Sequence, residues 1–420
     1  ELAFWAGEVK KQLGQYDEAI VLFQSFLEKH GAGLPELAER ARHELEACNW
    51  ALDMLAAQDP DVDIHPLDDE VNTPYAEFGA LRLGDTLYFS SYSFTQKEKK
   101  QYPPRQFSKL LMRVGDQPPV LVSFNDEKEH TAYLTFTPDR SRAFFNICRY
   151  VTAASIRCEL YALEVHDGQP YGTPMRLPTP LNLEGFTSTQ PHVGYDPQTG
   201  EQGLFFVSDR PEGKGGLDIW YAPLDSMGLP GEPLNLAEVN TPGNDVTPFF
   251  DSEMRRLYFS SNGRRSMGGY DVFRADKTDN GWGEVVNIGP PINGSFDETH
   301  FVVEPGGAGG FFASNRLGSK FLAPEYEACC SDLYAFQYKA LQLNLFTYNH
   351  QTREPLSGVA INLYELKPNG ELHLVTSADN PDSNDFRFPL ERNKKYVIVA
   401  SRPGFLDHTD TLDMRAPEFR

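Results

Sequence analysis

One short phrase recurs along the chain and limits what it can fold into. The clearest copies join LYFSSN at 257–262 to GGYDVF at 268–273, and LFFVSDR at 204–210 to GGLDIW at 215–220. Each copy reads as a strand, a glycine-rich turn and a second strand. The aromatic residue at the centre of the phrase recurs in stronger and weaker copies at Phe89, Phe145, Phe206, Phe259 and Phe312.

The spacing of these aromatic residues predicts the architecture. They lie 56, 61, 53 and 53 residues apart. Repeats of roughly 40 to 50 residues or more, built of short strands, are typical of β-propeller blades. The 31 Pro and 34 Gly supply turn residues for many short connections. The sequence therefore predicts a mainly β protein with a five-bladed β-propeller.

The number of strands predicts how the ring of blades closes. Segments 234–241 and 286–293 read as outer fourth strands, and each leads into the next repeat. A similar segment at 62–67 has no repeat before it, while the fifth repeat, around Leu333, has no outer strand of its own. We therefore expect residues near Ile64 to pair with the blade that contains Leu333, which removes exposed sheet edges.

The two ends of the chain have other patterns. Apolar residues at three- and four-residue intervals predict helices from residue 1 to about 57. Leucines alternate with polar residues at 341–345, and several further short strands follow, which predicts a small β-sandwich. The expected domains are a helical segment at 1–58, the propeller at 59–338 and the sandwich at 339–420.

Charge and hydropathy exclude several classes of function. The formal net charge of −22 argues against a nucleic-acid partner, because affinity for phosphates comes from clustered Lys and Arg. The cluster of Lys97, Lys99 and Lys100 is predicted to be a solvated loop. No apolar run approaches the roughly 18 residues of a membrane span. The chain begins at Glu1 without Met, so we expect a processed or truncated product with any export signal or lipid anchor outside it.

The five cysteines leave two alternatives open. Cys148 and Cys158 flank a short segment between two predicted strands of one blade, where a cross-strand disulfide can form or both thiols can stay free. A disulfide would indicate an oxidising compartment. Cys329 and Cys330 are adjacent, Cys48 lies in a predicted helix, and no C-x-x-C spacing supports a zinc or iron–sulfur site.

No motif specifies a catalytic site. The sequence has no G-x-S-x-G elbow, no H-E-x-x-H and no phosphate-binding G-K-[ST] loop. Aligned inner strands place His192 and His300 in one column with Asp245 and Asp297 just upstream, which is one way to build a cation site. The two histidines come from blades that are not neighbours, so we expect separately satisfied polar residues. We assign no catalytic, cofactor-binding or metal-binding residue, and no cofactor.

Acidic residues also recur just before the predicted third strands. Regularly repeated acids of this kind are typical of turns, where the carboxylate accepts hydrogen bonds from backbone N–H groups. We therefore predict a turn-stabilising role, not a catalytic one, for Glu159, Asp218, Asp271 and Asp332.

Several segments resemble known families. LGQYDEAI at 13–20 resembles the centre of a tetratricopeptide repeat, and the phrases around Phe206 and Phe259 resemble the PD40 (WD40-like) repeats of periplasmic proteins. PLSGV at 355–359 and YVIVASRPGF at 396–405 resemble the carboxypeptidase regulatory-like, or transthyretin-like, module. In this order the parts resemble the outer-membrane-associated family of Bacteroidetes that includes PorE of the type IX secretion system.

This resemblance implies a function without catalysis. It implies a periplasmic, outer-membrane-associated scaffold that links secretion or envelope machinery to the cell wall through protein–protein contacts. In that family an OmpA-like domain that binds peptidoglycan usually follows, so peptidoglycan is expected as a partner only through a domain outside this chain, which stops at Arg420. The acidic surface favours basic partners at long range.

A second interpretation is a propeller that binds or cleaves glycans. Some five-bladed propellers are glycosidases, which use paired carboxylates near the mouth of the central channel. Carboxylates on the inner strands of three or more blades, all facing one cavity, would favour this interpretation. Oligosaccharide binding and hydrolysis assays distinguish it from the scaffold.

Overall fold

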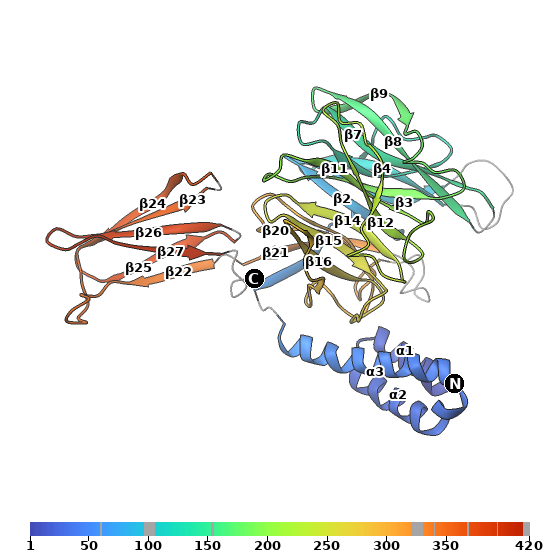
Figure 1. Cartoon of the computed structure of the whole chain (residues 1–420), viewed down its shortest axis with the longest axis horizontal. Helices are drawn as coiled ribbons and strands as arrows, with labels where there is room; N and C mark the ends of the chain where they lie inside the picture. Colours follow the sequence, from blue (N-terminus) through green and yellow to red (C-terminus); the bar gives the residue numbers. More distant parts are fainter. Residues whose placement is uncertain are drawn as a thin grey trace. The chain divides into compact units, whose positions relative to one another are not determined.

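The computed structural model describes residues 1–58, 61–95, 106–152, 155–320, 331–339, 341–367, 369–392 and 394–414. The described part is mainly β, as the repeats predict (Figure 1). It divides into two compact units, Glu1–Val303 with Gly310–Phe336 and Glu304–Gly309 with Gln337–Arg420. The predictions for Lys97, Lys99, Lys100, Cys329 and Cys330 fall outside the described residues.

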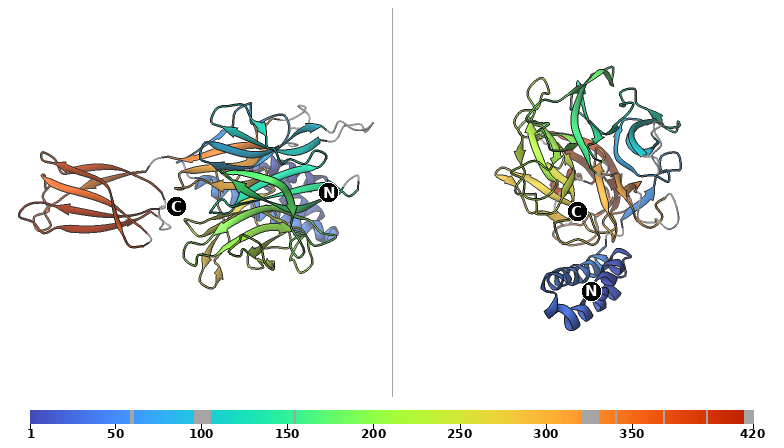
Figure 2. Two further views of the ribbon diagram at one scale, coloured as in Figure 1. Left: turned by 90° about the horizontal axis from the view of Figure 1, so that it is seen from above. Right: turned by 90° about the vertical axis from the view of Figure 1, so that its right-hand side faces the viewer.

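Four sheets of consecutive antiparallel strands follow one another in the first unit and surround a central axis (Figure 2). The first two are β2 (Glu77–Leu83), β3 (Thr86–Thr95), β4 (Gln106–Val114), β5 (Val120–Leu121), and β6 (His130–Phe136), β7 (Arg142–Tyr150), β8 (Ile156–His166), β9 (Gln169–Arg176). The next two are β10 (Ser188–Tyr195), β11 (Gln202–Ser208), β12 (Asp218–Pro223), β13 (Leu234–Asn235), and β14 (Asp245–Asp251), β15 (Arg256–Ser261), β16 (Asp271–Thr278), β17 (Gly281–Trp282), β18 (Val286–Asn287).

The fifth blade combines strands from both ends of the propeller. β19 (Glu298–Val303), β20 (Gly309–Ser314) and β21 (Asp332–Tyr338) are completed by β1 (Val62–Pro66), which lies beside β21. The Leu67 N–H continues this pairing by donating to the Leu333 carbonyl at 2.9 Å. A strand from before the first blade thus covers the edge of the last one, and the ring is a five-bladed propeller.

One asparagine in each blade extends the sheet with its side chain. In the fifth blade the Asn72 Oδ1 accepts from the Leu333 N–H at 2.8 Å, and the Asn72 Nδ2 donates to the Leu333 carbonyl at 3.0 Å. A side-chain amide carries both a donor and an acceptor, so it can pair with a strand residue as another strand would. The same two bonds, at 2.8–2.9 Å, join Asn125 to Leu110, Asn182 to Leu160, Asn240 to Ile219 and Asn293 to Val272.

The hydrophobic core lies between neighbouring blades, and strand alternation explains the paired aromatic residues of the repeat. Phe144 packs toward the third blade with Phe206, while Phe145 packs toward the first blade with Tyr88. Between the fifth and first blades the same role falls to Phe89 and its buried neighbours. Each second strand therefore fills two interfaces, which is why it reads as a continuous apolar run.

Three helices precede the propeller and pack against its fourth blade. They are α1 (Leu2–Gln12), α2 (Tyr16–His30) and α3 (Pro35–Ala56), with a 3₁₀ turn at Gly31–Gly33. Gly7 lets α1 and α2 approach, because a Cβ there would stand 2.7 Å from the Phe23 ring. The Tyr16 hydroxyl donates to the Met267 carbonyl at 3.0 Å, and the Met267 side chain is buried among the helices. None of the helices in the described ranges has the length and apolarity to cross a membrane.

The second unit consists of two sheets. One has the order β24-β23-β26-β27 and the other pairs β22 with β25. Its core contains Ile361 and Leu363 from the first sheet and Phe386 and Phe388 from the second. The bounds are β22 (Leu341–Phe346), β23 (Val359–Leu366), β24 (Leu372–Asn380), β25 (Asp385–Leu390), β26 (Lys395–Ser401) and β27 (His408–Asp413).

A disulfide joins two strands of the second blade. Cys148 of β7 and Cys158 of β8 are direct partners in the antiparallel register, and their sulfurs are bonded. Of the two alternatives that the sequence leaves open, the structure has the bridged one. Cys48 is buried in α3 with a free thiol.

Candidate functional site

Each inner strand of the propeller is interrupted at the same point. The pairing of β2, β6, β10, β14 and β19 with their second strands shifts at a β-bulge near the middle of the strand. Non-glycine residues rarely adopt a positive φ, so a set of them at one structural position marks strained backbone. The first bulge residue has a φ of 52–66° in all five blades, at Gly79, Tyr133, Gln190, Thr247 and His300.

Hydrogen bonds between neighbouring blades hold this ring of bulge residues. The His300 N–H donates to the Thr247 Oγ1 at 3.2 Å, and the Thr247 N–H donates to the Gln190 Oε1 at 2.8 Å. The N–H groups of Gln190 and Tyr133 donate in the same way to the preceding blade, to the Asn146 Oδ1 at 3.3 Å and the Ser90 Oγ at 3.2 Å. The strained positions are therefore fixed by bonds from blade to blade.

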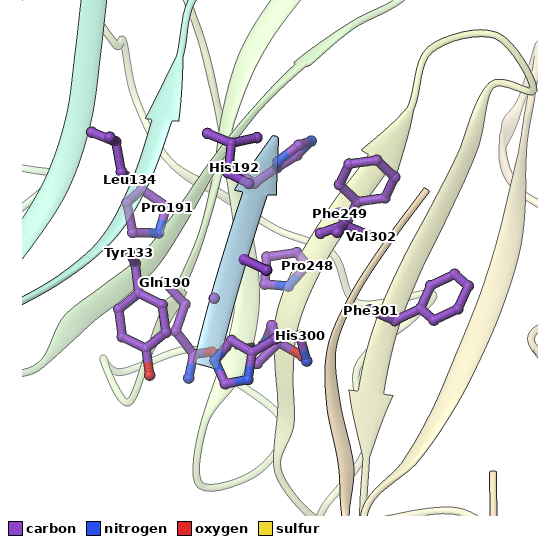
Figure 3. A pocket seen from close by; sticks show the side chains of 14 residues that line it. Tyr133, Leu134, Gln190, Pro191, His192, Pro248, Phe249, His300, Phe301 and Val302 are labelled. Atoms are coloured by element: carbon purple, nitrogen blue, oxygen red, sulfur yellow. Dashed lines mark hydrogen bonds between the residues drawn. The ribbon is translucent and has the colours of Figure 1, made fainter. Parts of the chain in front are cut away.

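Aromatic rings gather at this level of the channel. The His300 ring stacks on the Tyr133 ring, with centres 5.3 Å apart and planes 11° apart. The Phe78 ring lies 5.1 Å from the Tyr133 ring and 5.4 Å from the His300 ring. Figure 3 shows Tyr133, Gln190 and His300 converging from three different strands. A polar and aromatic group thus lies at the axis.

A cavity of about 60 Å³ remains beside these residues (Figure 3). A cavity needs roughly 10–15 Å³ to hold a water molecule, so this one has space for water. Its other walls are mostly apolar and include Leu81, Leu134 and Phe249. None of its fourteen lining residues is Asp, Glu, Lys or Arg.

Both histidines in the cavity wall are neutral near pH 7. Burial lowers the pKa of His192 to about 4 and the pKa of His300 to about 3. The His192 Nε2 is 3.3 Å from the Phe250 carbonyl, to which it can donate, and the His300 Nδ1 is 2.9 Å from the Thr299 hydroxyl. Among the described groups, the buried His300 Nε2 has no hydrogen-bond partner. The cavity therefore combines an uncharged wall with an unused imidazole nitrogen.

Because of the bulges, the alignment of the inner strands that the sequence suggests is wrong at the two histidines. The sequence places His192 and His300 in one column, but His300 is a bulge residue and His192 lies two positions after one, at the place of Phe249. Both histidines line the same cavity, each with its own partners. Asp297 instead accepts the Tyr270 N–H at 2.8 Å. Within the described residues no three His, Cys, Asp or Glu side chains are placed to hold a metal ion.

Carboxylates do recur on inner strands, but they stabilise loops and do not line the cavity. Glu77, Asp245 and Glu298 stand two residues before the bulge residue in three blades, and all three are fully buried. Each accepts a hydrogen bond from the backbone N–H four residues earlier, at Thr73 (2.8 Å), Thr241 (2.6 Å) and Gly294 (2.8 Å). Their recurrence thus has a structural reason, and they are no pair of catalytic groups facing one substrate.

The pH dependence of stability tests this structural role at Glu77. Burial raises the pKa of Glu77 to about 7, against hydrogen bonds from Ser91 and Thr73 that lower it. The folded state therefore holds the proton more tightly than the unfolded state, so this group stabilises the fold below its ordinary pKa and stops doing so as pH rises through about 7. Relative to Glu77→Gln, which stays neutral, the wild type should lose roughly 2 kcal/mol of unfolding free energy between about pH 5 and about pH 8. Urea titrations at both pH values measure this, and a constant difference would contradict it.

The acids before the third strands behave largely as the sequence predicts. Asp218 accepts the N–H groups of Lys214 and Gly215, Asp271 those of Met267 and Gly268, and Asp332 that of Lys320. Glu159 differs, because its carboxylate pairs with Arg176 at 2.6 Å and Arg149 at 3.2 Å. Three of the four carboxylates are thus turn-stabilising acceptors, and the fourth is in an ion-pair cluster.

Sequence reasoning missed the bulge residues Tyr133, Gln190 and Thr247. The sequence contains a signal in two blades, because a proline directly follows the bulge residue there. Pro191 follows Gln190, and Pro248 follows Thr247. Proline within a strand usually marks a bulge, since it lacks the N–H that a regular ladder needs. Reading these prolines as bulges would have aligned the inner strands correctly.

Comparisons with known proteins give no match in sequence and a distant one in structure. No protein-family model matches the chain, and no curated protein matches it. A thermostable family-43 glycoside hydrolase is 12% identical, with 75% of this chain and 100% of that chain covered and a TM-score of 0.41. The α-L-arabinofuranosidase from Lactobacillus brevis is 12% identical (69% and 95% covered, TM-score 0.40), as is an exo-β-1,3-galactanase from Clostridium thermocellum (80% and 83% covered, TM-score 0.40).

These comparisons correct the identification with the PorE-like family. The similar structures are named as glycoside hydrolases, and none of those above is a secretion or OmpA-type protein. The predictions of a non-enzymatic scaffold and of secretion-machinery partners are withdrawn for the same reason. At such identities and TM-scores the likeness assigns no activity to this chain, so its function has to be argued from the site itself.

Proposed function

We propose that the protein binds the end of a neutral carbohydrate chain at the central channel of the propeller. The observation that carries this proposal is the ring of bulge residues, which brings a phenol, a carboxamide and an imidazole together at Tyr133, Gln190 and His300. Ligand sites of this kind combine aromatic and apolar walls with a few fixed polar groups. Hydroxyl groups of a sugar can both donate to and accept from such side chains.

The uncharged wall supports a neutral ligand. The lining residues include no Asp, Glu, Lys or Arg, and both histidines are neutral near pH 7. A phosphate, carboxylate or ammonium group would enter this cavity without a counter-charge, which costs several kcal/mol. A hydroxyl group has no such cost if it finds a partner, and the buried His300 Nε2 has none among the described residues.

The size of the cavity supports binding at a chain end. Its volume of about 60 Å³ is far below that of a typical pocket that encloses a drug-sized ligand. A hydroxymethyl arm fits this space, while the sugar ring stays at the mouth. We therefore propose that one terminal unit inserts an arm beside Tyr133 and His300 and that the rest of the chain lies outside.

The proposal concerns binding, and cleavage is measured separately. Glycoside hydrolysis uses two carboxyl groups on either side of the bond. The residues lining this cavity include none, so chromatography of oligosaccharides after incubation is needed to detect any hydrolysis at another place.

His300→Phe tests the proposed site. Phenylalanine keeps a ring against Tyr133, so the fold should be retained. It removes both imidazole nitrogens, which are the atoms that the substitution tests. We expect the variant to bind neutral oligosaccharides at least about tenfold more weakly in isothermal titration, because a buried hydrogen bond is lost. His166→Ala, an exposed histidine of the same propeller, is the control and should bind as the wild type does. Equal affinities of wild type and His300→Phe, or no binding of any neutral oligosaccharide by the wild type, would refute the proposal.

We further propose that the protein works in an oxidising compartment such as the periplasm. Structural disulfides persist in such compartments, and Cys148 and Cys158 are bridged. Alkylation of the protein directly upon cell lysis, followed by mass spectrometry, tests this, since labelled Cys148 and Cys158 would speak against it.

Two domain assignments also remain proposals. We propose that α1–α3 form a tetratricopeptide-like layer, which the close approach of α1 and α2 at Gly7 supports. We propose that the second unit is a carboxypeptidase regulatory-like sandwich, which its two facing sheets support. An experimental structure of each part, superposed on members of the two families, tests both assignments.

A further inference from the structure

A second hollow, of about 80 Å³, lies between the third and fourth blades. Its lining includes the aromatic residues Phe205, Tyr221, Phe250 and Trp282. Three charged residues, Asp196, Glu201 and Lys277, complete its rim. We call this hollow the interblade cleft. Its mixture of aromatic surface and charged rim differs from the neutral wall of the channel.

Two glycines shape the interblade cleft. A Cβ on Gly203 would stand 2.0–2.4 Å from three atoms of the Tyr221 side chain, and a Cβ on Gly194 would stand 2.7 Å from the Phe205 ring. The Tyr221 ring therefore lies directly against the backbone of β11, and Phe205 forms the floor with Phe250. Any larger residue at either glycine would displace these rings.

Trp282 is brought to the cleft by a short hairpin at the end of the third strand of the fourth blade. The short strand β17 carries Trp282 and pairs with the end of β16. The backbone N–H of Trp282 donates to the Glu238 Oε2 at 2.6 Å, so a residue of the connection between the third and fourth blades holds this part of the chain in place. The Lys277 ammonium lies 4.9 Å from the centre of the Trp282 ring.

The interblade cleft and the channel cavity are neighbours along the same strands. On β10, His192 lines the channel and Gly194 lines the cleft, which at about 3.4 Å per residue places them about 7 Å apart. On β14, Phe249 faces the channel and the next residue, Phe250, faces the cleft. The bond from the His192 Nε2 to the Phe250 carbonyl joins the two walls.

We propose that the interblade cleft binds the sugar units that follow the one at the channel, so that the ligand is an oligosaccharide. This inference rests on the proposed function. The apolar face of a sugar ring can pack on Tyr221, and its hydroxyl groups can donate to Glu201 and accept from Lys277. The ammonium already held over Trp282 disfavours a cationic ligand at the same place.

A chain-length series tests the inference. Isothermal titration of the full chain with neutral mono-, di-, tri- and tetrasaccharides of one repeating unit should give affinity that rises with length. In Trp282→Ala we expect about a tenfold loss for the tetrasaccharide and no change for the monosaccharide, because only the units beyond the first reach the cleft. Lys277→Met, which keeps the apolar stem, should reduce the tetrasaccharide affinity severalfold. Trp5→Ala, at an exposed tryptophan of α1, is the matched control and should change neither.

The outcomes separate this inference from the proposed function. If the wild type binds the monosaccharide and the tetrasaccharide equally, or if Trp282→Ala keeps the full dependence on length, the cleft is no subsite while the channel site stands. If the wild type binds no neutral saccharide, both proposals are overturned. Thermal unfolding of each variant shows whether a loss of affinity reflects a loss of fold, and a folded Lys277→Met variant with unchanged affinity would count against the cleft.

Discussion

Asn72→Ala is expected to lower the free energy of unfolding of the first unit by about 2–3 kcal/mol. The substitution leaves the N–H and the carbonyl of the buried Leu333 without the Asn72 amide. A buried group that loses its partner costs about 1–3 kcal/mol, as the Leu333 N–H does here, while the Leu333 carbonyl loses one of its two donors and keeps the Leu67 N–H. The segment that carries Asn72 also supplies β1 to the fifth blade, so the loss weakens the closure of the ring.

Asn240→Ala is the matched control for this prediction. It removes the same two bonds, to Ile219, within the third blade. Denaturant titration should therefore give both variants a similar loss, while hydrogen exchange should separate them. The amide of Leu333 and its neighbours in β21 should exchange faster in Asn72→Ala and stay protected in Asn240→Ala. A loss below about 1 kcal/mol for Asn72→Ala, or unchanged protection of β21, would contradict this closure.

Arg210→Met is expected to cost about 3–4 kcal/mol of unfolding free energy. Arg210 is only 7% exposed, and its guanidinium donates to the carbonyls of Pro180 and Leu181 at 2.9 and 2.5 Å. It also lies 4.8 Å from the ring centre of Phe206, and burial lowers its pKa to about 10. Methionine keeps the apolar stem, but it takes the guanidinium donor from both carbonyls, leaving the Leu181 carbonyl with the Ser188 hydroxyl, and it removes the cation–π contact.

Arg42→Met, at an exposed position of α3, is the control and should change stability by less than about 0.5 kcal/mol. The same contact recurs at Arg264 over Phe259 and at Arg316 over Phe312. If Arg210→Met were as harmless as Arg42→Met in urea titration, the arginine of the repeated phrase would have no structural role.

The repeated phrase made much of the fold predictable. Its aromatic markers fall on the second strands of five sheets, and Phe206, Phe259 and Phe312 are fully buried there. Strand counting placed residues near Ile64 beside the sheet of Leu333, and in the structure β1 lies next to β21. Both inferences depend on patterns that are local in sequence, which is where sequence carries the most information.

Other features depend on three-dimensional context and stayed hidden. The asparagines at positions 72, 240 and 293 are visible in the sequence, but no periodicity indicates that their side chains pair with third strands. The bulges shift the inner strands, so the column of His192 and His300 was wrong. The interblade cleft depends on Gly203 meeting Tyr221 from another strand, which no periodicity indicates.

The functional prediction failed for a different reason. The order of domains and a general resemblance of blade phrases indicated a secretion scaffold, while His192 and His300 were considered only as ligands of a cation. Blade phrases such as the one around Phe259 specify packing between sheets, and packing is common to propellers with many functions. The site lies in bulge residues such as Gln190 and Thr247, and the five blades each carry a different residue type there.

A crystal structure of the protein with a bound neutral tetrasaccharide tests the central claim most directly. Our account predicts one terminal unit at the channel with an arm between Tyr133, Gln190 and His300, and the following units over Tyr221 beside Trp282. A tetrasaccharide bound anywhere else on the chain, with the channel cavity left to water, would contradict it.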